Sequence, residues 1–227
     1  MTEKDFLALS RAGFNRIPLT LETLADLDTP LSLYLKLANA PGSYLLESVI
    51  GGERFGRYSI IGLAARERIE VAGGRGRVIR DGAVVQERDA GDPLAFVDEY
   101  LKGVAAAPLQ SGLRFAGGLA GYFSYDTVRY IEPKLAGDSR PDPIGLPDVR
   151  LLLSEELAVV DNVAGKVHLI VYADAREPDA YAKARARLEA LRGKLRGAAT
   201  LPEHVAIAQP QPPRSNIGEQ PFYAAVA

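Results

Sequence analysis

The sequence GSYLLESVIGGERFGRYSIIG spans residues 42–62 and sets the expectation for the fold. Tyr44 to Val49 is mostly apolar and follows a glycine, which is typical of a strand, and Tyr58 to Ile61 has the same character. A Gly-Gly break and a charged loop separate the two segments. We therefore expect two strands that pair or lie close together.

Polar side chains interrupt this apolar stretch at Glu47 and Ser48, and such groups need partners or water. Strand pairing would bring them near Arg57 and Ser59. A carboxylate, two hydroxyls and a guanidinium suit a small zwitterion. The alternative is a sheet whose polar residues face solvent, and the residue types alone favour that alternative because short motifs match often by chance.

The length, composition and net charge of the chain argue against several classes of protein. The 227 residues, 47% of them apolar, suffice for one large domain or two small ones. A formal net charge of -2 with mixed signs argues against a nucleic-acid surface. The absence of Cys removes disulfide and thiolate chemistry and is compatible with a reducing cytoplasm. The polar N-terminus is not a signal peptide, and no apolar run approaches the roughly 20 residues of a membrane span.

Hydrophobic periodicity and turn signals predict an α+β fold, in which antiparallel sheets stack as a sandwich with flanking helices. We expect helices at residues 5–12, 29–38, 92–103 and 179–195, and further strands at residues 66–72, 77–80, 83–88, 117–125, 149–153, 157–160 and 166–172. Apolar spacing assigns three buried helix faces. Their members are Leu31, Tyr34, Leu35 and Ala38; Leu94, Val97, Tyr100 and Leu101; and Tyr181, Ala184, Leu188 and Leu191.

Glycines at positions 117, 118 and 121 allow either a phosphate-binding loop or a close approach of two sheets. The spacing does not match a phosphate-loop motif, so we favour tight packing. Asp126 and Arg129 lie three residues apart and are expected to form a structural ion pair.

The remaining histidines and acidic residues do not form a complete active site. His168 lies in an expected strand and is more simply structural, and His204 lies in a proline-rich segment without carboxylates nearby. Glu155 and Glu156 are adjacent strand residues, so they point to opposite faces and cannot flank one bond. No metal-ligand spacing is present.

Several motifs resemble one family. Leu45-Leu46-Glu47-Ser48, followed by residues 56–62, is similar to the N-terminal region of component I of anthranilate synthase, a chorismate-utilising enzyme. The resemblance continues at residues 15–18, 28–31 and 117–126 and covers nearly the whole chain. Any one motif is weak, but together they are specific.

The resemblance implies a parent lyase that converts chorismate and ammonia to anthranilate and pyruvate in the cytoplasm, for tryptophan biosynthesis. It also implies magnesium as cofactor and a glutamine amidotransferase subunit, component II, as the source of ammonia. In the family the catalytic and magnesium-binding groups lie in the C-terminal portion. We therefore expect no catalytic residue and no metal ligand in this chain, which should be inactive alone.

The same resemblance implies that this chain carries half of an allosteric pocket for L-tryptophan, the feedback inhibitor. Leu46, Glu47 and Ser48 would form one side, with Glu47 meeting the ligand's ammonium group. Tyr58 and Ser59 would line the other side, and Pro30 matches a proline near the pocket.

Residues 1–200 are expected to form the regulatory domain, and residues 201–227 a proline-rich linker with the truncated start of the C-terminal portion. The related aminodeoxychorismate synthase component I shares much of this pattern and remains an alternative. Two others are a stand-alone amino-acid-binding module and a structural domain that docks an amidotransferase.

Overall fold

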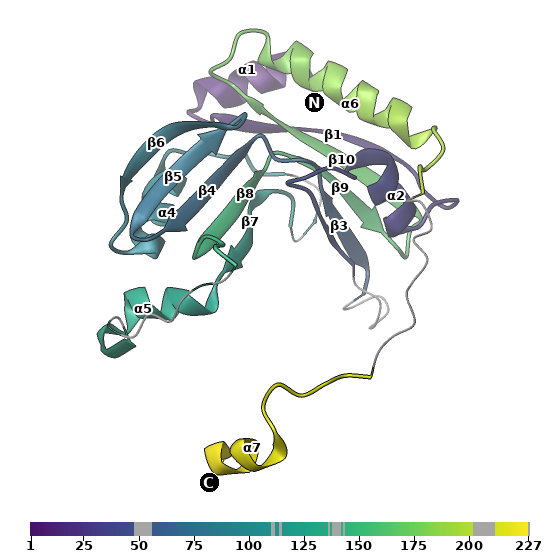
Figure 1. Cartoon of the computed structure of the whole chain (residues 1–227). Helices are drawn as coiled ribbons and strands as arrows, with labels where there is room; N and C mark the ends of the chain where they lie inside the picture. The colour runs from purple at the N-terminus through teal and green to yellow at the C-terminus, as the bar shows by residue number, and fades with distance from the viewer. Residues whose placement is uncertain are drawn as a thin grey trace.

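Two antiparallel sheets of five strands each form the framework of the computed structural model, and helices lie against them (Figure 1). The structure describes residues 1–47, 56–109, 112–113, 115–135, 137, 142, 144–201 and 212–226. The predicted α+β class with antiparallel sheets and flanking helices is confirmed.

The first sheet contains the stretch from which the sequence analysis began. Its strand order is β1 (Arg16–Leu24), β10 (Lys166–Asp174), β9 (Glu156–Asp161), β3 (Tyr58–Gly62) and β2 (Tyr44–Leu46). The predicted pairing of the two segments of that stretch is confirmed, because Leu45 lies opposite Ile61. The long β1–β10 pair joins the beginning of the chain to its last strand.

The second sheet is built mostly from local hairpins. Its order is β6 (Ala83–Asp89), β5 (Arg75–Arg80), β4 (Glu67–Ala72), β8 (Val149–Ser154) and β7 (Gly118–Phe123). Asp81 and Gly82 both have positive φ, at 50° and 83°, which produces the tight β5–β6 turn that the Asp-Gly pair predicts.

Close contacts explain two of the three predicted glycines, whereas a Cβ at Gly118 would meet nothing within 4 Å. A Cβ at Gly121 would lie 2.0 Å from the carbonyl oxygen of Arg150 on neighbouring strand β8. A Cβ at Gly117 would lie 2.7 Å from the ring of Tyr172, which belongs to the first sheet. The prediction of packing between sheets therefore holds for Gly117, whereas Gly121 is constrained within its own sheet.

Two short connections pass from one sheet to the other. Residues 63–66 join β3 to β4, and Glu155 alone separates β8 from β9. Because β3 pairs with β9 and β4 pairs with β8, the two connections lie next to each other. They form a corner from which the sheets diverge (Figure 1).

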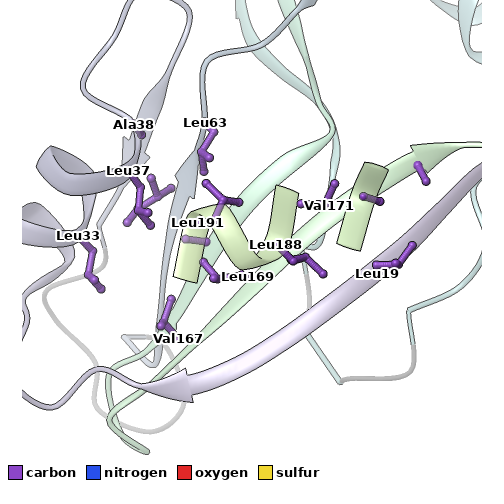
Figure 2. Packing of buried hydrophobic residues seen from close by; sticks show 14 of the residues in the cluster. Leu19, Leu33, Leu37, Ala38, Leu63, Val167, Leu169, Val171, Leu188 and Leu191 are labelled. Atoms are coloured by element: carbon purple, nitrogen blue, oxygen red, sulfur yellow. The ribbon is translucent and has the colours of Figure 1, made fainter. Parts of the chain in front are cut away.

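The main core lies between the first sheet and three helices, α1 (Glu3–Arg11), α2 (Pro30–Leu37) and α6 (Ala180–Leu195). Leu188 and Leu191 of α6 point toward Leu169 and Val171 of β10, and Leu33 and Leu37 of α2 complete the cluster (Figure 2). The predicted buried face of α6 is confirmed at Ala184, Leu188 and Leu191. A smaller cluster of Leu157, Val159 and Ile170 lies on the opposite face of the sheet.

Two predicted helix faces are only partly correct. Ala38 and Val97 are buried as predicted, but the predicted leucines Leu31, Leu94 and Leu101 are exposed. In α2 the buried residues are Leu33 and Leu37, whereas Leu31 is 53% exposed. In α4 (Pro93–Lys102) the buried residues include Phe96 and Val97, and Leu94 and Leu101 are more than 40% exposed. The physical reason in α4 is that the Phe96 ring occupies the space where Gly76 of β5 lacks a Cβ, a contact that periodicity within α4 does not contain.

The remaining elements lie at the surface. They are the short helices η1 (Tyr125–Thr127), α5 (Val128–Ile131) and η2 (Pro133–Leu135), and the helix α7 (Glu219–Val226), which is exposed throughout. Within the described residues, no helix combines the length and apolar character needed to cross a membrane.

Candidate functional site

The predicted ligand residues converge on one end of the first sheet, where β2 ends and β3 begins. Leu46 is the last residue of β2 and is 54% exposed, and Glu47 follows it with an exposed side chain. Tyr58 and Ser59 are the first residues of β3. Ser48, the central residue of the prediction, lies outside the described residues.

The sheet separates two of these side chains. Tyr58 packs against the cluster of Leu157, Val159 and Ile170 on one face. Ser59 lies opposite Val160, which belongs to the helix-covered core on the other face. Because neighbouring strand residues alternate, Tyr58 and Ser59 do not line the same wall of a pocket.

Pro30 lies at the first position of α2, after a Thr29 cap whose side chain accepts a hydrogen bond from the Ser32 amide at 3.1 Å. The loop before this helix is held against the β9–β10 turn, residues 162–165, because the Ala25 amide donates to the Gly165 carbonyl at 2.8 Å. The structure thus brings the start of α2 to the same end of the sheet as Ser59.

Hydrogen bonds from the β9–β10 turn hold the start of β3. The Asn162 side-chain amide donates to Ser59 Oγ at 3.0 Å and to the Gly56 carbonyl at 3.3 Å. The Asn162 backbone amide donates to the Arg57 carbonyl at 2.8 Å. Ser59 is fully buried, with 0% exposure.

Arg57 was expected beside Glu47 and Ser48, and the structure directs its guanidinium to Asp161, with Nη2 and Oδ2 2.7 Å apart. Hydrogen bonds from Arg57 lower the pKa of the Asp161 carboxyl despite its burial, and the backbone amides of Val163 and Ala164 add to the effect. Asp161 therefore carries a charge that Arg57 and the turn stabilise.

Asp161 and Asn162 also belong to this end of the sheet, although the sequence pattern did not predict a place for them in the site. An Asp-Asn pair before Gly165 does predict a turn, because these side chains readily bond nearby backbone groups. Their bonds to residues 56–59 depend on β9 lying next to β3, which strand order decides.

The other candidates occupy structural positions. Glu155 and Glu156 pair with different arginines, Arg16 at 2.6 Å and Arg187 at 2.7 Å. The predicted Asp126–Arg129 ion pair is confirmed at 2.7 Å. A cavity of about 270 Å³ lies beside Glu155 at the corner between the sheets, at the opposite end of β10 from the β9–β10 turn. Many of the charges that line it, those of Arg16, Glu155 and Asp174 among them, already form ion pairs with one another.

Comparison with known proteins gives a consistent assignment. The chain is 48% identical to anthranilate synthase component 1 of Neisseria gonorrhoeae over 229 aligned residues, which cover 100% of this chain and 46% of that protein. It is 54% identical to the protein of the same name from Pseudomonas aeruginosa over 86% of this chain and 40% of that protein. No family model matches the chain.

A solved structure agrees with the sequence relatives. The crystal structure of anthranilate synthase component I from Streptococcus pneumoniae TIGR4 matches with a TM-score of 0.51 and 27% identity, over 78% of this chain and 37% of that one. The chain spans about half the length of the curated relatives it matches. These matches, which extend over the whole chain, place it in the family of proteins named anthranilate synthase component 1.

Proposed function

We propose that this chain is the N-terminal part of an anthranilate synthase component I whose parent enzyme works in the cytoplasm. The parent is a lyase that converts chorismate and ammonia to anthranilate and pyruvate for tryptophan biosynthesis. A glutamine amidotransferase subunit, component II, supplies the ammonia. The observation that supports this proposal is the 48% identity to a protein of that name across the whole chain.

The chemistry of the parent belongs to the portion that lies outside this sequence. Among the described residues, no group of three or more Asp, Glu or His side chains could hold a metal ion. We propose that the magnesium ion of the parent's reaction is bound outside these described residues. We propose that the chain alone does not turn over chorismate.

The function proposed for this part is feedback inhibition by L-tryptophan. Glu47 is exposed at the end of β2, where its carboxylate is open to the ammonium group of an amino acid. Leu46 beside it offers a half-exposed apolar surface, and Pro30 begins a helix at the same end of the sheet. Ser48 and Tyr58 complete the proposed half-pocket, and the buried Ser59 would support it from the other face of the sheet.

Calorimetric titration of this chain with L-tryptophan tests the proposal. We expect binding that weakens about 10-fold or more in both Glu47→Ala and Ser48→Ala, since a hydrogen bond to a charged group contributes about 1.5–3 kcal/mol. Glu99→Ala is the matched control, because it removes an exposed carboxylate of α4 that forms an ion pair with Lys102 at 2.9 Å.

The same titration on the full-length parent completes the test. Binding by the parent alone would show that the pocket needs the second half. A folded parent that neither binds tryptophan nor is inhibited by it would contradict the feedback function and favour the related aminodeoxychorismate synthase.

A further inference from the structure

The β9–β10 turn holds the start of β3 on the β9 side of this strand. The proposed ligand residue Glu47 follows β2, which lies on the other side of β3. Ser59 Oγ accepts a hydrogen bond from Asn162 Nδ2 at 3.0 Å, and two further bonds from Asn162 reach the backbone of Gly56 and Arg57. A single residue of the β9–β10 turn thereby contacts three of the four residues from Gly56 to Ser59. The next residue of β3, Ile60, lies opposite Leu46 at the end of β2, and Glu47 follows Leu46.

Burial constrains what Ser59 does in the site. Its side chain is 0% exposed, so its hydroxyl is not open to a ligand arriving from solvent. The Ser59 oxygen is also occupied by the Asn162 donor. Ser59 is buried, whereas Asn162 is exposed in the turn, so breaking the bond would leave the Ser59 hydroxyl without this partner inside the sheet while water could replace it at Asn162.

We propose that Asn162 is a positioning residue of the tryptophan site and that Ser59 acts with it rather than as a ligand contact. This inference rests on the proposed function. The Ser59–Asn162 pair fixes the start of β3, and β3 in turn sets where β2 ends and where Glu47 stands. Asp161 adds a second connection between the same turn and the same segment, through its ion pair with Arg57.

A double-mutant cycle in the full-length parent enzyme distinguishes positioning from direct contact. The variants are Ser59→Ala, Asn162→Asp and the two combined, and the measurement is the inhibition constant of L-tryptophan. Asn162→Asp keeps the side-chain shape and the preference for a turn, but it removes the donor to Ser59. Each single variant should raise the inhibition constant about 2- to 13-fold, the range expected for one lost hydrogen bond.

The combined variant is decisive. If the two residues act as one pair, its inhibition constant should equal that of the weaker-binding single variant within about twofold. If Ser59 contacted the ligand by itself, the two increases would multiply, and that outcome would overturn the inference. An unchanged inhibition constant in Asn162→Asp would overturn it as well.

Two comparisons separate regulation from general damage. Lys166 lies on the same β9–β10 hairpin and forms an ion pair with Glu22 of β1. Lys166→Ala removes this pair without changing a contact to β3, and it should leave the inhibition constant unchanged. Melting temperatures of all variants show whether the fold persists, because a general loss of structure would lower the melting temperature while it raised the inhibition constant. A wild-type parent that tryptophan does not inhibit would refute the proposed site itself, and this result is distinct from a failure confined to the variants.

Discussion

Arg16 bridges two carboxylates at the corner between the sheets. Its side chain is only 8% exposed and lies 2.6 Å from Glu155 and 2.7 Å from Asp174. Burial raises the pKa of Glu155, and the charge of Arg16 opposes that increase. Removing a buried cation leaves such carboxylates without compensation, whereas an exposed cation is replaced by water.

The chain offers an exposed counterpart in Arg75, which also bridges two carboxylates, Glu87 and Asp89, but with 50% of its side chain exposed. We expect Arg16→Met to lower the free energy of unfolding at pH 7 by about 3–5 kcal/mol. Arg75→Met should lower it much less, because water screens an exposed ion pair and takes its place when it is lost. Urea denaturation of both variants measures the difference, and equal losses would show that burial does not decide the contribution.

At the scale of elements, α4 shows how a helix face depends on its partner. Phe96 is 3% exposed and fills the space above Gly76, while Leu101 on the same helix is 41% exposed. Phe96→Ala should lower the free energy of unfolding by about 3–5 kcal/mol, because it leaves a cavity. Leu101→Ala is the control and should cost less than about 1 kcal/mol. Similar losses, measured by thermal and urea denaturation, would contradict the observed orientation of α4.

This comparison also explains how far the sequence predicts the fold. The faces of α6 and the pairing of β2 with β3 follow from periodicity and turn residues within each segment. The faces of α2 and α4 follow from periodicity only in part, because Gly76 and the sheet surface also determine which positions are buried. A helix of eight or ten residues has several apolar spacings, and only packing selects among them.

The candidate site also has a part that the sequence predicts and a part that it does not. The motif around Glu47 was visible in the sequence, and its partners on β3 were expected. The alternation that separates Tyr58 from Ser59 was also available from strand geometry. The contribution of Asp161 and Asn162 was not available, because it requires β9 to lie between β3 and β10.

For the whole molecule, the carboxylates at both ends of the first sheet predict loss of stability in acid. Burial would raise the pKa of Asp174, but hydrogen bonds from Arg176 and the charge of Arg16 lower it to about 2. The pKa of Asp161 is also lowered, first by Arg57. A lowered folded pKa means that the stabilisation is present above the unfolded value, roughly 3.9, and is lost as the pH falls through the folded value.

We therefore expect the free energy of unfolding to fall steeply between about pH 4 and pH 2. Asp174→Asn should be less stable than the wild type at pH 7, and the gap should narrow as the pH approaches 2. Denaturation at a series of pH values measures this gap. A gap that stays constant with pH would show that the charge of Asp174 does not contribute.

The pairing of β1 with β10 has a consequence for how the chain folds during synthesis. Arg16 lies opposite Asp174, so the first strand has no partner until nearly the whole sheet has been translated. The hairpins β4–β5–β6 pair within about 20 residues and need no distant segment. Non-local pairing is slow because loop closure precedes its contacts. On the ribosome the hairpins form early. β1 remains unpaired until β10, the strand that it pairs with, has been synthesised.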